Sequence, residues 1–211
     1  HTLAMTAAAS GLSPVAALSH QFTGLAGIKS LKSLDDSHSE QAAIKHTAQV
    51  FSRLHEKVKT AAKSYMLTME ADKQEEDIAG FEEIWQPQTA VAGTRLSLAE
   101  IKQQTKQMWI ANTQVNFCAK AYPTVTMEHD DAAALTVLGG FLRNGFLHTA
   151  IREQGGAYGG GAMHDSNIAA FKFFSYRDPR LSETLDDFDA AIDWMLNNEH
   201  ESRQLEEAIL G

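Results

Sequence analysis

A glycine-rich stretch at residues 155–161 contains one aromatic residue, Tyr158. The stretch reads Gly155-Gly156-Ala157-Tyr158-Gly159-Gly160-Gly161. So many glycines allow the backbone to approach another group closely, and a tyrosine hydroxyl held there can donate a hydrogen bond to an oxyanion. The pattern is compatible with a site whose backbone approaches another group closely and whose tyrosine stabilises negative charge. It is also compatible with a flexible turn that closes a helix, with Gly155 as its left-handed cap.

Arg152 stands six residues before Tyr158, in the last turn of a predicted helix. Its planar guanidinium could hold a peptide carbonyl or a carboxylate. An arginine at such a position is also favoured by the helix dipole alone, without any ligand. The spacing of Arg152 and Tyr158 leaves both interpretations open.

The same glycines do not match a phosphate-binding loop. They follow a predicted helix, whereas the glycines of P-loops and dinucleotide-binding folds follow a strand and open a helix. Gly161 is followed by Ala162 and not by Lys-Ser or Lys-Thr. This context argues against a nucleotide site.

Nine histidines suggest a metal site at first sight, but their spacing does not support one. A helical zinc pair needs two ligands three or four residues apart, and no two histidines here have that spacing. His55-Glu56 and His200-Glu201 each lack the second histidine of an H-E-x-x-H motif, and H-x-x-E-H is absent as well. We therefore predict no complete metal site within this chain.

Nucleophilic catalysis has equally little support. There is no G-x-S-x-G motif, and scattered Ser, His and Asp residues do not define a triad. Cys118 is the only cysteine, so no disulfide can form within the chain. It lies in the apolar run 115–119, which is typical of a buried strand.

The overall composition is that of an ordinary globular protein with a formal net charge of −9. Nucleic acids and anionic lipids are bound by clustered Lys and Arg, so neither is an expected partner. No apolar run approaches the roughly 18 residues that would span a bilayer, so no membrane segment is predicted. The start at His1 without Met and the apolar end at Gly211 indicate that both termini are cut.

The elements that must position Arg152 and Tyr158 begin with a helical region. Residues 2–59 are predicted to be helical, with a helix start at Ser13-Pro14. A long helix follows the polar residues 35–37, and its apolar side chains have helical spacing. They predict one buried stripe, formed by Ile44, Phe51, Leu54 and Val58. We assign residues 1–62 to a helical segment that ends a preceding domain.

From Ser64 the apolar period changes to two, which predicts a strand and the start of a second domain at residues 63–211. A helix with a capping-box spacing at Asp72 is predicted to end by Pro87. The polar stretch 88–107 is predicted to be a mobile connector. Adjacent strands are predicted at 108–111 and 115–122.

The remaining residues predict a long helix, a hairpin and a final helix. The long helix spans 131–153 and contains Gly139-Gly140, which we expect to pack closely against a neighbouring backbone. The hairpin has its turn at 164–167 and is followed by a strand at 169–176 and a helix at 182–198. This order predicts an α+β fold, with helices packed on one face of a mainly antiparallel sheet.

Two stretches resemble a known family. Residues 141–159 contain R-E-x-G-G-A-Y-G, and residues 173–179 contain S-Y-R-D-P. Together they resemble the fourth domain of the presequence protease branch of the pitrilysin/insulinase family of zinc metallopeptidases. The resemblance extends from about residue 64 to 211, and residues 11–34 resemble the end of the family's third domain.

The resemblance implies a metallopeptidase α/β-roll domain in one half of a clamshell enzyme that encloses its substrate. In that family the amino-terminal half holds zinc through an inverted H-x-x-E-H motif and a distal Glu, which this chain lacks. The carboxy-terminal half supplies an Arg and a Tyr, and these match Arg152 and Tyr158. Arg152 would bind the substrate backbone, and Tyr158 would steady the tetrahedral intermediate formed when zinc-bound water attacks the carbonyl. The corner at residues 176–179 is interpreted as structural.

The function implied is the substrate-binding part of a zinc metalloendopeptidase that degrades unfolded peptides. Its partners would be extended peptides, added alongside a sheet edge, and the amino-terminal half of the same polypeptide. The chain alone is expected to bind no zinc and to be inactive, and its compartment would be cytoplasmic in a bacterium or an organellar matrix in a eukaryote. The substrate-binding residues would be Arg152, Gly155, Gly156, Ala157, Tyr158 and Gly159.

Two alternative interpretations remain. The chain could be a catalytically inert structural or peptide-binding subunit of the same family, although the presence of Arg152 and Tyr158 favours an enzyme. A small-ligand-binding regulatory domain with an α+β fold has no positive motif.

Overall fold

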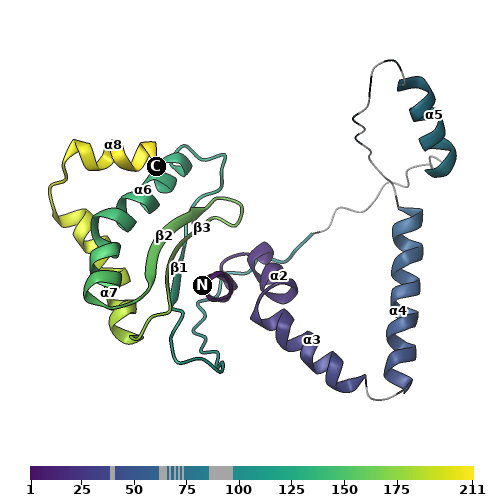
Figure 1. The fold of residues 1–211 in the computed structure, drawn as a ribbon, viewed down its shortest axis with the longest axis horizontal. Coiled ribbons are helices and arrows are strands. Elements are labelled where there is room, and N and C mark those ends of the chain that lie inside the picture. Colours follow the sequence, from purple (N-terminus) through teal and green to yellow (C-terminus); the bar gives the residue numbers. More distant parts are fainter. Residues whose placement is uncertain are drawn as a thin grey trace. The chain divides into compact units, whose positions relative to one another are not determined.

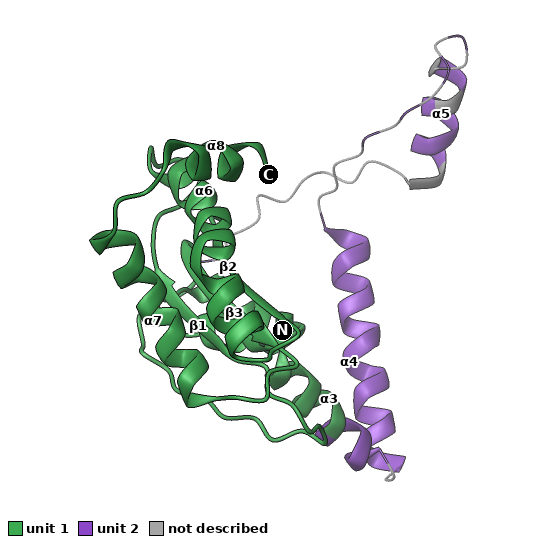
Figure 2. Ribbon diagram, turned by 60° about the vertical axis from the view of Figure 1, so that its left-hand side comes forward, with its two compact units in different colours: residues 1–32, 98–211 green, residues 33–97 purple. Residues whose placement is uncertain are grey.

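The computed structural model describes residues 1–38, 41–61, 66, 68, 70, 72, 74–85 and 97–211. They form two compact units, one of residues 1–32 with 98–211 and one of residues 33–97 (Figure 2). The predicted domain boundary at residues 62 and 63 lies outside the described residues and stays a prediction. The first unit contains every predicted site residue.

The chain begins with helices, as the sequence predicts. They are α1 (Thr2–Ala9), α2 (Pro14–Phe22) and α3 (Leu25–Ser37). Ser13 caps α2, because its Oγ accepts a hydrogen bond from the Ala16 N–H at 3.2 Å. Pro14 occupies the first turn, where its missing N–H costs no hydrogen bond. The predicted helix start is confirmed.

The second unit contains α4 (Gln41–Thr60) and α5 (Gln74–Trp85), which confirm the two helices predicted there. The buried stripe predicted on α4 was wrong, since Ile44, Phe51, Leu54 and Val58 are 45, 65, 51 and 70% exposed. An amphipathic helix buries its apolar face only against a second surface, and the described residues bury none of α4. The strand predicted from Ser64 falls mostly on residues outside the described part.

The sheet has three antiparallel strands in the order β1-β3-β2. β1 spans Ala119–Pro123, β2 Gly159–Asp165 and β3 Ala170–Tyr176. The predicted hairpin of β2 and β3 is confirmed, but its turn lies at residues 166–169 and not at 164–167. β2 extends further than predicted because His164 and Asp165 still pair with Phe171 and Ala170.

Two strand predictions before the sheet need correction. Residues 108–111 form no strand, and Met108 and Ile110 are 81 and 92% exposed. The Trp109 ring instead contacts His20 of α2 edge-on, with 5.9 Å between ring centroids. The strand predicted at 115–122 begins only at Ala119, and Asn116 forms an isolated bridge with Asp178.

The long helix predicted at 131–153 is present but changes its winding midway. α6 (Ala132–Leu142) is an α-helix, and it continues directly as η2 (Arg143–Gln154), a π-helix. The final predicted helix is confirmed as α7 (Ser182–Asn197). A further helix, α8 (Ser202–Leu210), was not predicted.

The core lies between the sheet and the helices α6, η2 and α7. Phe173 of β3, Phe188 of α7 and Leu142, Leu147 and Ile151 of the long helix are fully buried there. Phe174 and Tyr176 alternate with Phe173 and therefore lie on the opposite face, where the His1 ring before α1 lies 5.2 Å from each. Figure 1 shows α6 and α7 on one side of the sheet and the N-terminus on the other. The predicted α+β class is confirmed. Among the described residues, no helix is long and apolar enough to cross a membrane.

Candidate functional site

Arg152 lies in the last turn of η2, and its side chain is exposed. The chain closes behind it through two backbone hydrogen bonds, from Gly156 N–H to Arg152 C=O and from Ala157 N–H to Ile151 C=O, both 3.1 Å long. Gly156 has a φ of 77°, in the left-handed region that glycine adopts without steric cost. The closing turn predicted from the glycines is present. Its left-handed residue is Gly156 and not Gly155, whose φ is −81°.

Gly155 serves a different purpose, because a Cβ at this position would overlap the Arg180 guanidinium. Arg180 Nη2 donates a hydrogen bond to the Ala150 C=O at 3.2 Å and pairs with Asp187 Oδ2 of α7 at 2.8 Å. The absence of a side chain at Gly155 thus lets Arg180 link the end of η2 to α7. The backbone that carries Arg152 is held by this link.

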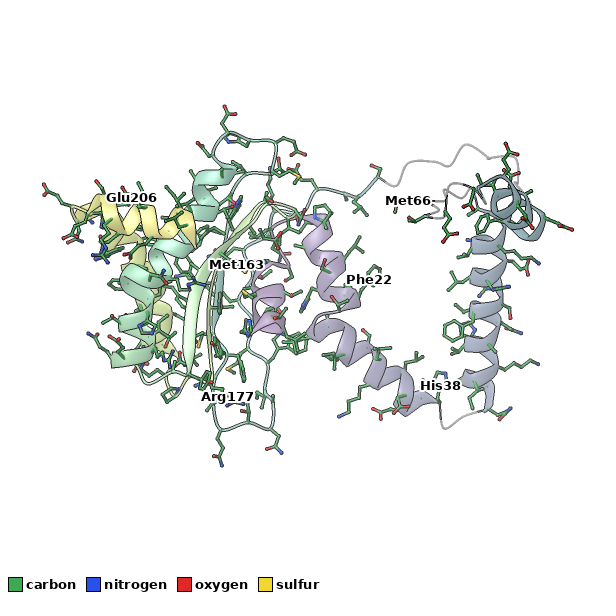
Figure 3. The ribbon with its side chains drawn as sticks, turned by 45° about the horizontal axis from the view of Figure 1, so that its top comes forward. Phe22, His38, Met66, Met163, Arg177 and Glu206 are labelled. Atoms are coloured by element: carbon green, nitrogen blue, oxygen red, sulfur yellow. The ribbon has the colours of Figure 1, made fainter. Side chains whose placement is uncertain are left out.

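Tyr158 immediately precedes β2, and its side chain is 61% exposed. Its ring centroid lies 5.7 Å from that of Tyr176. The guanidinium carbon of Arg177 lies 5.5 Å from the same Tyr158 centroid, at the end of the sheet where Figure 3 labels Arg177. The Tyr158 N–H donates a hydrogen bond to the Arg177 C=O at 3.3 Å. The end of β3 therefore fixes the Tyr158 backbone, while most of its side chain stays accessible.

The last three glycines of the stretch are part of β2 and not of a loop, which corrects the prediction of a turn there. A Cβ at Gly159 would lie 2.5 Å from the Tyr176 hydroxyl, and one at Gly160 would lie 2.9 Å from the Phe174 carbonyl oxygen. A Cβ at Gly161 would lie 3.2 Å from Cδ of Arg143. The density of glycines is thus explained in large part by close approach of the chain's own residues.

Arg152 precedes Tyr158 in the sequence, and Arg177 follows it at the end of β3. Both side chains are exposed. Within the described part of the chain, neither forms an ion pair or a side-chain hydrogen bond. In a protein of net charge −9, an exposed guanidinium of this kind can hold a carbonyl oxygen or a carboxylate.

The corner at residues 176–179 contains a buried carboxylate. Asp178 has no exposed surface, and its Oδ1 accepts a hydrogen bond from the Arg180 N–H at 2.9 Å. Its Oδ2 accepts one from the buried Thr184 hydroxyl at 2.8 Å. These bonds join the end of β3 to the first turn of α7. Asp178 therefore has a structural role, as the sequence predicts for this corner.

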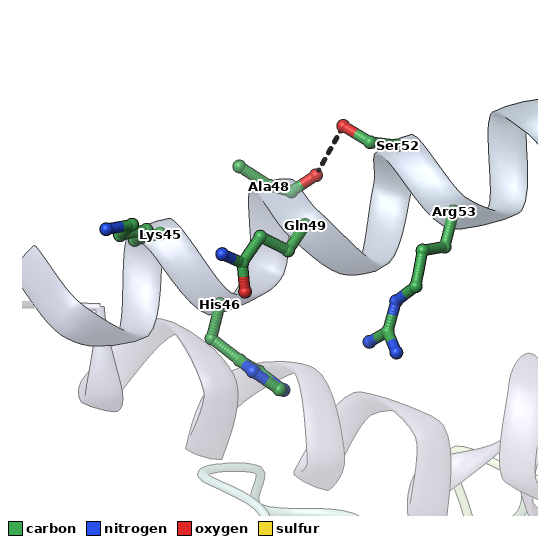
Figure 4. Close-up of a pocket in the computed structure, with 6 residues that line it drawn as sticks. All are labelled: Lys45, His46, Ala48, Gln49, Ser52 and Arg53. Carbon is green, nitrogen blue, oxygen red and sulfur yellow. Dashed lines mark hydrogen bonds between the residues drawn. The ribbon is translucent and has the colours of Figure 1, made fainter.

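The described residues do not fit a zinc site, since they contain no group of three or more His, Cys, Asp or Glu residues that could hold a metal ion. A hollow lies on the surface of α4 (Figure 4). Its lining residues all come from this one helix and are Lys45, His46, Ala48, Gln49, Ser52 and Arg53. None of them is a predicted site residue.

The sequence predicts Arg152 and Tyr158 as site residues but does not predict the contacts of Tyr176 and Arg177 with Tyr158. Both residues belong to the S-Y-R-D-P motif, whose corner is interpreted from the sequence as structural only. The signal that could have found them is the hairpin register, because β2 and β3 pair Gly159 with Tyr176. The residues that flank this pair, Tyr158 and Arg177, then meet at the end of the sheet.

Comparison with known proteins assigns this domain to a family. The family described as the PreP C-terminal domain matches residues 106–211. The mitochondrial presequence protease of Yarrowia lipolytica is 31% identical over the whole chain, which covers 21% of that protein. That of Danio rerio is also 31% identical over the whole chain and is covered to 23%. That of Kluyveromyces lactis is 45% identical over 40% of the chain and 9% of its own length.

The chain spans about a fifth of the length of the first two of these relatives. The matched residues 106–211 include the whole sheet, the long helix and the turn that carries Arg152 and Tyr158. The family match and the similarity of the whole chain to presequence proteases indicate the same family. The chain therefore belongs to the presequence protease branch of the pitrilysin family of peptidases, and it represents a carboxy-terminal part.

Proposed function

We propose that this chain is the substrate-binding carboxy-terminal part of a zinc metalloendopeptidase that degrades unfolded peptides. The amino-terminal half of the same polypeptide would hold the zinc, because the described residues of this chain do not fit a zinc site. The chain alone would then bind no zinc and hydrolyse no peptide. The relatives are named mitochondrial, and we extend this compartment to the chain as part of the proposal.

The observation that carries the proposal is the pair of Arg152 and Tyr158 on one anchored turn. Both side chains are exposed, while the backbone between them is fixed by the Gly156 and Ala157 hydrogen bonds. Arg152 would bind a carbonyl or carboxylate of the peptide with its exposed guanidinium. Tyr158 would donate its hydroxyl proton in a hydrogen bond to the oxyanion that forms when the scissile carbonyl is attacked.

A rigid backbone matters for this chemistry. A donor stabilises a transition state most when it is already positioned, since no free energy is then spent on reorganisation during the reaction. The Arg180 contacts to Ala150 and Asp187 hold the turn from the helix side. The Tyr158 hydrogen bond to Arg177 holds it from the sheet side. The two exposed side chains thus stand on a backbone held from both sides, which is the preorganisation that the proposed chemistry requires.

The test uses the full-length protein and the variants Arg152→Ala and Tyr158→Phe. Loss of a single oxyanion donor lowers kcat about 10²- to 10³-fold, and we expect this range for Tyr158→Phe. Arg152→Ala should lower kcat/KM about 10- to 100-fold through loss of substrate positioning. Steady-state cleavage of a fluorogenic peptide measures both, and zinc content measured on the same samples should not change.

Two matched controls remove the same groups elsewhere. Arg203→Ala deletes an exposed guanidinium that pairs with Glu207 on α8 at 2.9 Å. Tyr122→Phe deletes a hydroxyl that donates to Asp189 at 2.7 Å. Both controls should keep normal turnover. Near-normal turnover of Arg152→Ala and Tyr158→Phe would refute the proposed roles, and a full-length protein without zinc would favour the inert subunit instead.

A further inference from the structure

Arg177 has a backbone conformation that arginine rarely adopts. Its φ is 49°, in the left-handed region that is unfavourable for residues with a Cβ. The other non-glycine residue with a positive φ in the described part of the chain is Ala169, with a φ of 51°, in the β2–β3 turn. A side chain retained in such a conformation points to a use that glycine could not serve.

The turn at the end of β3 does not by itself require an arginine. The left-handed residue redirects the chain so that Asp178 bridges Asn116, and it presents the Arg177 C=O to the Tyr158 N–H at 3.3 Å. Both contacts use main-chain atoms, and glycine would make them with less strain. The turn therefore explains the backbone of Arg177 but not its side chain.

The side chain of Arg177 has one described contact, the ring of Tyr158 at 5.5 Å from the centroid. This distance is within the range of a cation–π interaction. The ring of Tyr176 lies 5.7 Å from the same Tyr158 centroid at an interplanar angle of 50°. Two neighbours from the end of β3 thus contact a ring that is otherwise 61% exposed.

We propose that Arg177 is a positioning residue that holds the ring of Tyr158 and thereby aims its hydroxyl. This inference rests on the proposed function of Tyr158 as an oxyanion donor. A tyrosine has two rotatable bonds between its backbone and its ring, so a fixed backbone alone does not fix the hydroxyl. The guanidinium and the Tyr176 ring both lie against the Tyr158 ring and restrict it, and this contact accounts for an arginine at a position with a strained backbone.

The experiment uses the full-length protein with Arg177→Gly and Arg177→Lys. Glycine keeps the left-handed turn and removes the cation, and we expect kcat to fall about three- to tenfold with KM nearly unchanged. Lysine keeps a cation that can lie over the ring, so Arg177→Lys should recover most of the lost turnover. Zinc content and melting temperature, compared with those of the parent protein, establish that each variant is folded.

Two further variants distinguish positioning of the ring from a general effect of backbone strain. Ala169→Gly relieves the same backbone strain away from the tyrosine, and it should leave kcat unchanged. In the Tyr158→Phe background there is no hydroxyl to aim, so adding Arg177→Gly should lower kcat no further. Unchanged kcat in Arg177→Gly, or an equal loss with and without the Tyr158 hydroxyl, would overturn the proposal. Normal turnover of Tyr158→Phe would instead refute the proposed function itself.

Discussion

At the scale of single residues, Asp178 is a carboxylate with no exposed surface. A buried carboxylate costs free energy unless its oxygens accept hydrogen bonds, and both oxygens of Asp178 do so. The donors are the Arg180 N–H at 2.9 Å and the Thr184 hydroxyl at 2.8 Å. Asp178 thereby joins the strand that contacts Tyr158 to the helix that anchors the turn of Arg152.

We expect Asp178→Ala to lower the free energy of unfolding by about 2–4 kcal/mol, because the buried Thr184 hydroxyl and the part-buried Arg180 N–H lose their acceptor. Urea unfolding followed by circular dichroism measures the change. The matched control is Asp189→Ala, whose side chain is 52% exposed and pairs with Lys120. An exposed ion pair contributes about 1 kcal/mol or less, so the control should lose less. Equal losses for the two variants would contradict the structural assignment of Asp178.

Residue types and spacing draw attention to Arg152 and Tyr158 without deciding their role, and the residues that the family match covers include both. Residue types and spacing also do not explain why Gly155 and Gly156 are both glycine, because the two positions have different requirements. Gly156 is needed for its φ of 77°, which the sequence assigned to Gly155. Gly155 is needed because Arg180 occupies the space of its Cβ, and that contact comes from a residue 25 positions later. Such contacts depend on tertiary packing and leave no local signal.

At the scale of elements, the packing of α6 on β2 depends on one of two adjacent glycines. A Cβ at Gly139 would lie 2.9 Å from the Ala162 carbonyl oxygen and 3.1 Å from the Cα of Met163. The nearest atom to a Cβ at Gly140 is the Ala208 carbonyl oxygen of α8, at 3.7 Å, an ordinary contact. The close packing predicted for this pair is therefore confirmed for Gly139 alone.

The two positions form a matched pair of substitutions. Gly139→Ala should lower the free energy of unfolding by about 1–3 kcal/mol, because the helix must move away from the β2 backbone. Gly140→Ala should raise it by up to about 1 kcal/mol, since alanine favours a helix interior more than glycine does. Urea unfolding of both variants measures the difference. A stabilising Gly139→Ala would show that α6 does not pack on β2 as described.

The sequence predicted the existence and order of most elements from residue 131 onward but not their finer geometry. Apolar periodicity over a few turns does not separate an α-helix from a π-helix, so the change of winding at Arg143 was missed. Periodicity also predicted a buried face on α4, although burial depends on a second surface that the pattern does not contain. The apolar run at 108–111 contains Trp109, which packs on α2 and not in the sheet.

At the scale of the whole molecule, residues far apart in the sequence join the N-terminal helices to the sheet domain. The Gln103 N–H donates a hydrogen bond to the Gly11 C=O at 2.8 Å, and Gln107 Nε2 donates to Ser10 Oγ at 3.0 Å. The rings of Trp109 and His20 meet edge-on. Residues 1–32 and 98–211 therefore form one compact unit.

The His20 contact predicts a pH dependence of this unit. The His20 side chain is buried, with 6% of its surface exposed, and its Nδ1 has no hydrogen-bond partner among the described residues. Burial lowers the pKa of His20 below its ordinary value of 6.5, because the charged imidazolium loses its hydration. The unfolded chain then takes up a proton at a higher pH than the folded chain does.

The sign of the effect follows from this order of pKa values. Well above pH 6.5 His20 is neutral in both states, so its titration does not affect the unfolding free energy. As the pH falls from there toward the lowered pKa, the unfolded state binds more protons and the unfolding free energy decreases.

Urea unfolding between pH 8 and pH 5 should show this decrease in the parent protein and a smaller one in His20→Leu. If His20→Leu loses as much stability on acidification as the parent does, the titration of His20 does not control how the N-terminal helices hold to the sheet domain.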